Sequence, residues 1–102
     1  MYKRFYIELS LQERIRVQLK IEKGRVKDLV VQLETWNEEW LGVVRYNYAH
    51  GTPHKDFLYR DGRKFKEWFS QKTLEQVVND AITDLKANWM GYLLRCGYEK
   101  EK

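Results

Sequence analysis

The chain has 102 residues, 43% of them hydrophobic and 15% aromatic, which provides for one hydrophobic core and excludes a disordered polymer. A charged fraction of 33% indicates a well-solvated surface. No apolar run approaches the roughly 20 residues that span a bilayer, and the first residues lead into no apolar signal segment. We therefore expect a single cytoplasmic domain over residues 1–102 that does not associate with a membrane.

The net charge of +4 is concentrated in the middle of the chain. Between Gly42 and Lys72, seven Lys or Arg residues accompany three acidic residues, whereas the rest of the chain carries twelve of each sign. A basic segment of this kind suits an anionic partner such as the phosphate backbone of a nucleic acid. The alternative is that these residues only keep exposed strands soluble.

The first hairpin follows from the alternation of apolar and polar residues. Residues 14–22 alternate strictly, and after the turn at Lys23-Gly24-Arg25 the alternation resumes through residues 29–33, which predicts two half-buried strands. If their apolar sides coincide, two opposite-charge pairs also meet. The predicted cross-strand pairs are Ile15–Leu33, Val17–Val31, Leu19–Leu29, Arg14–Glu34 and Lys20–Asp28.

Further strands are predicted on either side of this hairpin. Residues 4–9 read as an edge strand, although the following Ser10-Leu11-Gln12-Glu13 also resembles a helix cap. A strand over residues 40–50 precedes a turn at Gly51-Thr52-Pro53 and a strand over residues 54–59. The turn signal Asp61-Gly62 then introduces a short strand over residues 64–69.

One long helix is predicted at the C-terminal end, over about residues 73–96. Thr73 and Gln76 form a capping box, and Gly97 supplies the stop. Cys96 reads as a small core residue at the end of the apolar stripe. The polar face carries Asp80 and Asp84, among others. The sequence therefore predicts an α+β fold, with an antiparallel meander of four or five strands within residues 4–69 and one long C-terminal helix packed on one face.

Both histidines of the protein, His50 and His54, flank the turn of the second hairpin. A three-residue loop would make them direct cross-strand neighbours, and one face would then hold an extended polar patch. The pairs expected from that register are His50–His54, Tyr48–Asp56, Tyr46–Leu58 and Val44–Arg60.

Such a patch could cleave RNA without a metal ion. Two imidazoles can divide proton removal and proton donation, so His50 and His54 are the candidate base and acid, with Asp56 orienting an imidazole. Basic and aromatic residues would neutralise phosphates and stack on bases. The candidate nucleic-acid-binding residues are Arg45, Tyr46, Tyr48, Lys55, Arg60, Arg63 and Lys64.

Two other interpretations of the same residues stay open. His50, His54 and Asp56 could bind a divalent cation, but no further His, Cys or acidic cluster in the sequence supports a metal site, so we expect no metal and no cofactor. Alternatively, the histidines are hydrogen-bonded structural residues that happen to flank a turn.

The run Arg45-Tyr46-Asn47-x-Ala49-His50-Gly51-x-x-His54-x-Asp56, followed by Asp61-Gly62-Arg63-Lys64, resembles a group of small uncharacterised prokaryotic proteins with an Arg-Tyr-Asp/Asn…His-Gly…His-x-Asp signature. More distantly it resembles the TumE-type toxins of toxin–antitoxin pairs. Two departures from the toxin pattern are that Asn47 stands where a carboxylate is expected and that the histidines are separated. The resemblance implies a prokaryotic, toxin-like protein with an antitoxin or other protein partner.

We therefore expect a small protein that binds or cleaves RNA through the hairpin of residues 45–64; if it is an enzyme, we expect a metal-independent ribonuclease. The alternative is a non-enzymatic protein–protein interaction module that dimerises through its sheet, since four Trp and seven Tyr residues can anchor interfaces. Open sheet edges also favour a homodimer.

Overall fold

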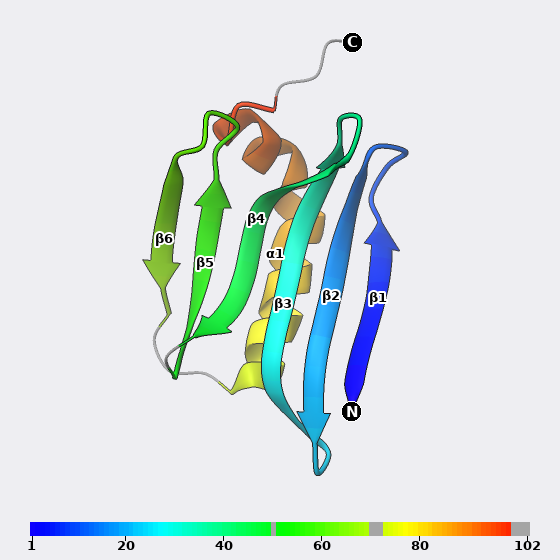
Figure 1. Ribbon diagram of the computed structural model, residues 1–102, viewed down its shortest axis with the longest axis vertical. Helices are drawn as coiled ribbons and strands as arrows, with labels where there is room; N and C mark the ends of the chain where they lie inside the picture. Colours follow the sequence, from blue (N-terminus) through cyan, green and yellow to red (C-terminus); the bar gives the residue numbers. More distant parts are fainter. Residues whose placement is uncertain (50, 70–72, 99–102) are drawn as a thin grey trace.

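In the part of the chain that the structure describes, six strands in chain order form one antiparallel sheet, and a single helix crosses one side of it (Figure 1). This computed structural model describes residues 1–49, 51–69 and 73–98. The meander and the C-terminal helix were predicted, but the expected number of strands was too low. The elements are β1 (Tyr2–Glu8), β2 (Glu13–Glu22), β3 (Arg25–Trp36), β4 (Trp40–Ala49), β5 (Thr52–Leu58), β6 (Lys64–Trp68) and α1 (Leu74–Arg95).

The predicted register of the first hairpin is confirmed. Val17 pairs with Val31 and Arg14 pairs with Glu34. The other three predicted pairs between β2 and β3 are also present. Strict alternation fixes this register, because a slip of one residue would turn every apolar side chain away from the core.

The predicted register of the second hairpin is wrong. Ala49 pairs with Thr52, so two residues separate β4 from β5, and Asn47 is the partner of His54. The register expected from a three-residue loop is shifted from the observed register by an odd number of positions. Such a shift moves every side chain of one strand to the other face of the sheet relative to its partner strand. The expected partner of His54, His50, lies outside the described residues. Tyr48, Tyr46 and Val44 pair with Pro53, Lys55 and Phe57 instead of Asp56, Leu58 and Arg60.

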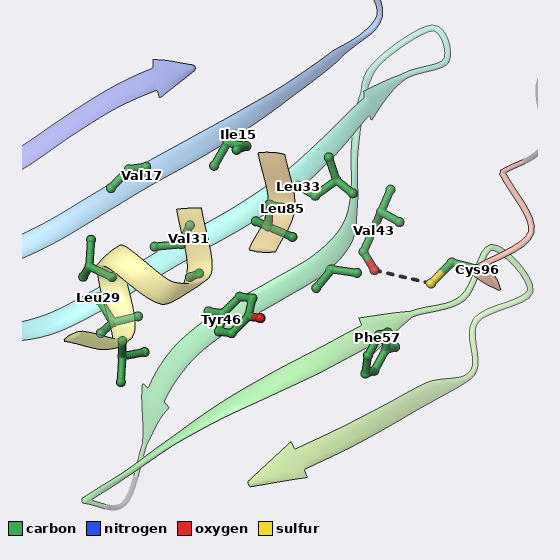
Figure 2. Packing of buried hydrophobic residues seen from close by; sticks show 14 of the residues in the cluster. Ile15, Val17, Leu29, Val31, Leu33, Val43, Tyr46, Phe57, Leu85 and Cys96 are labelled. Carbon is green, nitrogen blue, oxygen red and sulfur yellow. Dashed lines mark hydrogen bonds between the residues drawn. The ribbon is translucent and has the colours of Figure 1, made fainter. Parts of the chain in front are cut away.

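The hydrophobic core lies between the sheet and α1 (Figure 2). Cys96 is buried as predicted, and its Sγ lies 3.7 Å from the carbonyl oxygen of Val43. Burial raises the pKa of the Cys96 thiol, so this group stays protonated at neutral pH. The buried apolar side chains include Ile15, Val17, Leu29, Val31, Leu33, Val44 and Phe57 from the sheet, and Val77, Val78, Ala81, Leu85 and Leu93 from the helix.

The ends of α1 also match the sequence. The Thr73 hydroxyl accepts a hydrogen bond from the backbone N–H of Gln76, and the Gln76 side chain accepts one from the backbone N–H of Thr73. Gly97 follows the helix with a φ of +86°, a conformation that favours glycine. No helix in the described ranges has the length and apolar character that a membrane span requires.

Candidate functional site

The side of the sheet opposite α1 carries most of the polar side chains, and we call it the open face. Figure 1 views the molecule from this side, with α1 behind the strands. Strand pairing aligns the outward residues of all six strands in rows across the sheet. Along the described strands these positions hold seven basic and five acidic residues: Arg4, Arg14, Arg16, Lys20, Arg45, Lys64 and Lys66, and Glu8, Glu22, Asp28, Glu34 and Asp56.

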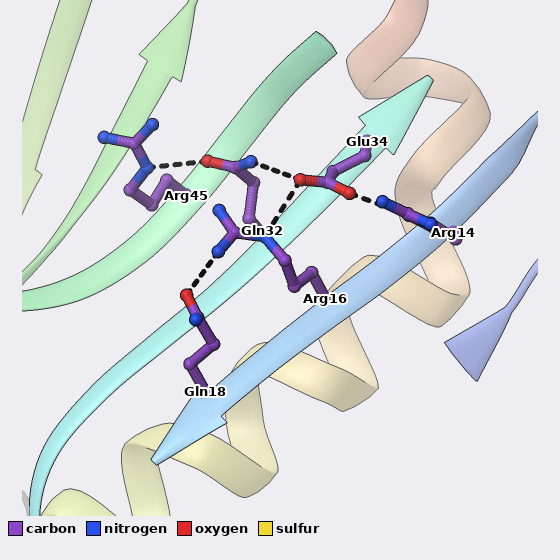
Figure 3. A network of polar contacts seen from close by, with 6 residues as sticks. All are labelled: Arg14, Arg16, Gln18, Gln32, Glu34 and Arg45. Atoms are coloured by element: carbon purple, nitrogen blue, oxygen red, sulfur yellow. Dashed lines mark hydrogen bonds and ion pairs between the residues drawn. The ribbon is translucent and has the colours of Figure 1, made fainter. Parts of the chain in front are cut away.

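A hydrogen-bond network at the centre of the open face fixes three arginines in place (Figure 3). The Glu34 carboxylate accepts hydrogen bonds from Arg14 Nε at 2.8 Å and Arg16 Nε at 3.0 Å, and from Gln32 Nε2 at 2.7 Å. Gln32 Oε1 in turn accepts one from Arg45 Nε at 2.6 Å. Arg14 and Arg45 each join this network through Nε, so that their Nη groups lie outside it (Figure 3).

Glu34 is the anchor of this network. Burial alone would raise the pKa of its carboxyl group, but the hydrogen bonds from Arg14, Gln32 and Arg16 outweigh burial and hold the pKa below its usual range. Glu34 is therefore ionised at neutral pH and balances one of the two positive charges beside it.

Aromatic rings flank the arginines. The Arg14 guanidinium lies between the rings of Tyr6 and Trp40, 4.2 and 3.9 Å from their centroids. Trp36 packs edge-on against Trp40 at 5.4 Å. Tyr6, Trp36 and Trp68 each keep between 43% and 54% of their surface exposed. The open face thus combines cations with accessible rings, the two features with which proteins hold single-stranded nucleic acids.

His54 and Asp56 lie on the open face beside Arg45, but they are buried. His54 is 3% exposed and lies against the ring of Trp68 at 4.9 Å. Its Nε2 lies 3.6 Å from Asp56 Oδ2, which also accepts a hydrogen bond from Asn47 at 3.2 Å. Asp56 therefore does lie beside an imidazole, as predicted. Because only 3% of His54 is exposed, a substrate hydroxyl could reach its imidazole only if neighbouring side chains moved, which argues against a catalytic role for His54.

The predicted patch is divided between the two faces by the β4–β5 register. Tyr46 and Lys55 point toward α1 and are 6% and 7% exposed, and Tyr48 packs against the core. Tyr46 and Lys55 therefore offer little accessible surface to a nucleic acid, while Tyr48 is partly buried. Arg45 remains on the open face because it pairs with Asp56.

Lys55 and Tyr46 instead belong to a cluster around Asp84 of α1. Lys55 Nζ lies 3.1 Å from Asp84 Oδ2, which also accepts a hydrogen bond from Tyr46 OH at 2.5 Å, and both Asp84 oxygens lie 2.7 Å from Tyr92 OH. Burial would raise the pKa of Asp84, but the donated hydrogen bonds keep it below its usual range. Burial and the bond to Asp84 raise the pKa of the Tyr46 hydroxyl. The predicted outward position of Asp84 is wrong, since this cluster ties α1 to the sheet.

The remaining predicted residues lie at the β5–β6 turn. Arg63 is exposed, and its Nε bonds to Asp61 Oδ2 at 2.7 Å. Arg60 is also exposed, and Lys64 lies at the rim of the open face opposite Leu58. These three cations are accessible to an anionic partner. Within the described ranges no three His, Cys, Asp or Glu side chains gather closely enough to hold a metal ion.

A hollow of about 460 Å³ opens at the β1 end of the open face. Six of its lining residues have their side chains on this face, in two rows of cross-strand neighbours. One row is Tyr2, Lys20 and Asp28, and the other is Arg4, Gln18 and Val30.

Sequence reasoning missed the centre of the open face. Arg14 and Glu34 had been paired correctly, but only as support for a register. The polar side of the β2 alternation, with Arg14, Arg16 and Gln18 in sequence, was the signal that could have identified a basic surface outside the hairpin of residues 45–64.

The fold and the open face together define an α+β protein whose sheet has one side packed on a helix and the other occupied by arginines, aromatic rings and buried polar groups. The chain belongs to the family described as Domain of unknown function (DUF7718), which matches residues 1–102. Searches of curated proteins and of solved structures found no match to the chain.

Proposed function

We propose that this protein binds single-stranded RNA across the open face, without cleaving it. The observation that carries the proposal is the arrangement of Arg14 and Arg45. Each is held through Nε in one network, which leaves its Nη groups to bind a ligand, and Arg14 also lies against the exposed ring of Tyr6. Arginine forks of this kind bind phosphate oxygens in pairs, and their fixed position reduces the entropy lost on binding.

A single strand fits this surface better than a duplex does. Sheets that bind single-stranded RNA stack unpaired bases on exposed aromatic rings, whereas a duplex hides its base faces. Tyr6 at one side and Trp68 at the other offer such rings, with the arginines between them. Five gaps between six strands of the sheet, at about 4.8 Å each, give roughly 24 Å, or about four extended nucleotides.

The test is fluorescence anisotropy with labelled 12-nucleotide single-stranded RNA at several salt concentrations. We expect Arg45→Ala and Lys66→Ala each to weaken binding about 3- to 10-fold and to lower the salt slope by about 0.7. Lys86→Ala removes the same charge from α1, away from the sheet, and should leave binding unchanged. Thermal melting of each variant confirms that it is folded. If no RNA binds, or if the Lys86 control weakens binding as much as the others, the proposal is wrong.

A second candidate function uses the same surface to dimerise. It is favoured by the exposed rings of Trp36 and Trp68, since large accessible aromatics commonly anchor protein interfaces. Sedimentation at micromolar concentration distinguishes the two functions. A species of 12.5 kDa that binds RNA supports the first function, while a dimer that dissociates on Trp68→Ala and does not bind RNA supports the second.

A further inference from the structure

We infer that the hollow at the β1 end of the open face binds the terminal nucleotide of the RNA through its phosphomonoester. This inference rests on the proposed function and specifies the chemical group that is read at one end of the bound strand. The hollow lies at an edge of the sheet, beside the central arginine network. A strand that crosses the open face would therefore end there.

Two cations on adjacent strands line the hollow. Lys20 pairs with Tyr2, and Arg4 pairs with Gln18, so the two basic residues are diagonal neighbours on adjacent strands. Diagonal neighbours in a sheet lie about 7–8 Å apart, which leaves space for one phosphate group between their charged ends. The side chain of Lys20 is 40% exposed and its Nζ contacts Glu22 at 3.2 Å, outside the hollow.

A neutral donor completes the phosphate contact. Gln18 accepts a hydrogen bond from Arg16 through Oε1, which orients the amide and leaves its NH₂ group to donate. This bond also connects the hollow to the central network, because Arg16 binds Glu34. A phosphate between Arg4 and Lys20 would then receive hydrogen bonds from two cations and one amide.

The paired cations Arg4 and Lys20 favour a terminal phosphate over an internal one, although Asp28 brings the formal charge of the six side chains on this face to +1. A phosphodiester within a strand carries one negative charge, whereas a monoester carries about 1.5 to 2 at neutral pH and so matches two cations. Tyr2 is 80% exposed at the rim and can stack on the terminal base. Asp28 faces the same hollow and suits the ribose hydroxyls, which donate hydrogen bonds to a carboxylate.

The experiment compares three labelled RNA oligonucleotides of one sequence, carrying a 5′-phosphate, a 3′-phosphate or hydroxyl groups at both ends, with the label on an internal base. At about 150 mM salt we expect one of the two phosphates to tighten binding about tenfold, and that oligonucleotide identifies the end that is read. Arg4→Ala and Lys20→Ala should reduce this preference to less than twofold. Lys66→Ala, at the far side of the open face, should weaken all three oligonucleotides equally and preserve the preference.

The outcomes separate this inference from the proposed function. If the three oligonucleotides bind equally well to the wild-type protein, the inference is wrong although RNA binding stands. If the preference survives both Arg4→Ala and Lys20→Ala, or disappears in Lys66→Ala, it reflects general electrostatics and the hollow does not carry it. If none of the oligonucleotides binds, the proposed function itself fails.

Discussion

Asn47 on β4 is the direct cross-strand partner of His54 on β5. Its amide donates a hydrogen bond to Asp56, the carboxylate beside the imidazole, at 3.2 Å. Asn47, His54 and Asp56 therefore form one polar group, in which His54 and Asp56 are buried and the imidazole packs against Trp68.

We expect His54→Ala to lower stability without affecting any reaction on RNA. The imidazole is buried, so its removal leaves a gap under Trp68 and costs about 1–3 kcal/mol, which lowers the melting temperature by roughly 5–15 °C. Differential scanning calorimetry measures this shift. A variant that melts like the wild type but loses a metal-independent ribonuclease activity would show that His54 is catalytic after all.

Removing the charge of Asp84 should lower stability more than removing the charge of Lys55, its partner in the cluster. Asp84→Asn removes the carboxylate that balances Lys55, whose side chain is 9% exposed, and should cost about 2–3 kcal/mol. Lys55→Met leaves Asp84 with hydrogen bonds from Tyr46, Tyr92 and Asn88, and places an apolar chain among the rings that surround Lys55. We expect a cost of about 1 kcal/mol or less for this variant. Urea unfolding of both variants measures these two costs. Equal losses of unfolding free energy in the two variants would contradict the prediction.

Acid should destabilise the protein over a pH range that the lowered pKa of Glu75 helps to define. Hydrogen bonds from Arg25 and from the backbone N–H of Val26 lower the pKa of Glu75 from 4.5 to about 2. A depressed folded-state pKa contributes stability above the unfolded-state pKa of 4.5, and this contribution is lost as the pH falls from there toward 2. The lowered pKa values of Glu34 and Asp84 act in the same direction.

Thermal melting between pH 7 and pH 2.5 measures this loss. In Glu75→Gln the side chain no longer titrates, so we expect its melting temperature to fall less steeply than that of the wild type below pH 4.5. Parallel curves for the two proteins would show that the hydrogen bonds of Glu75 with Arg25 and Val26 contribute nothing to stability.

Substitution by alanine should change stability in opposite directions at Gly42 and Gly91. A Cβ at Gly42 would lie 2.9 Å from the side chain of Gln32, which is buried in the central network. Gly42→Ala should therefore cost about 1–2 kcal/mol and weaken RNA binding by displacing the contact to Arg45. A Cβ at Gly91 meets no atom within 4 Å, so Gly91→Ala should stabilise α1 by about 0.5–1 kcal/mol. Urea unfolding tests both, and a neutral Gly42→Ala would mean that Gln32 moves freely.

The difference between the two hairpins explains what the sequence could predict. In β2 and β3 every second residue is apolar, so a wrong register would expose the core, and the pairs were predicted correctly. In β4 both Val43 and Val44 are buried, and the ladder shifts between Leu33 and Glu34. Alternation there favours no single register, and one error in loop length moved half of the candidate site to the wrong face.

Asp84 and the first strand also show where contacts with distant residues limit prediction from the sequence. Asp84 lies on the polar side of the helical pattern. Its half-buried position depends on the hydroxyl of Tyr46 and the amine of Lys55, both distant in sequence, as well as on Tyr92 and Asn88 of the same helix. The strand at residues 4–9 was ambiguous because its pairing with β2 depends on a neighbour and not on its own pattern.

The connectivity of the sheet has a consequence for folding kinetics. Every strand pairs with its neighbours in the chain, so each pairing closes only a short loop. Local pairings of this kind lower the contact order, and proteins of low contact order reach the native state quickly. The sheet can grow one hairpin at a time, and docking of α1 onto β3 and β4 closes the longest loops. We expect that docking step to limit the folding rate.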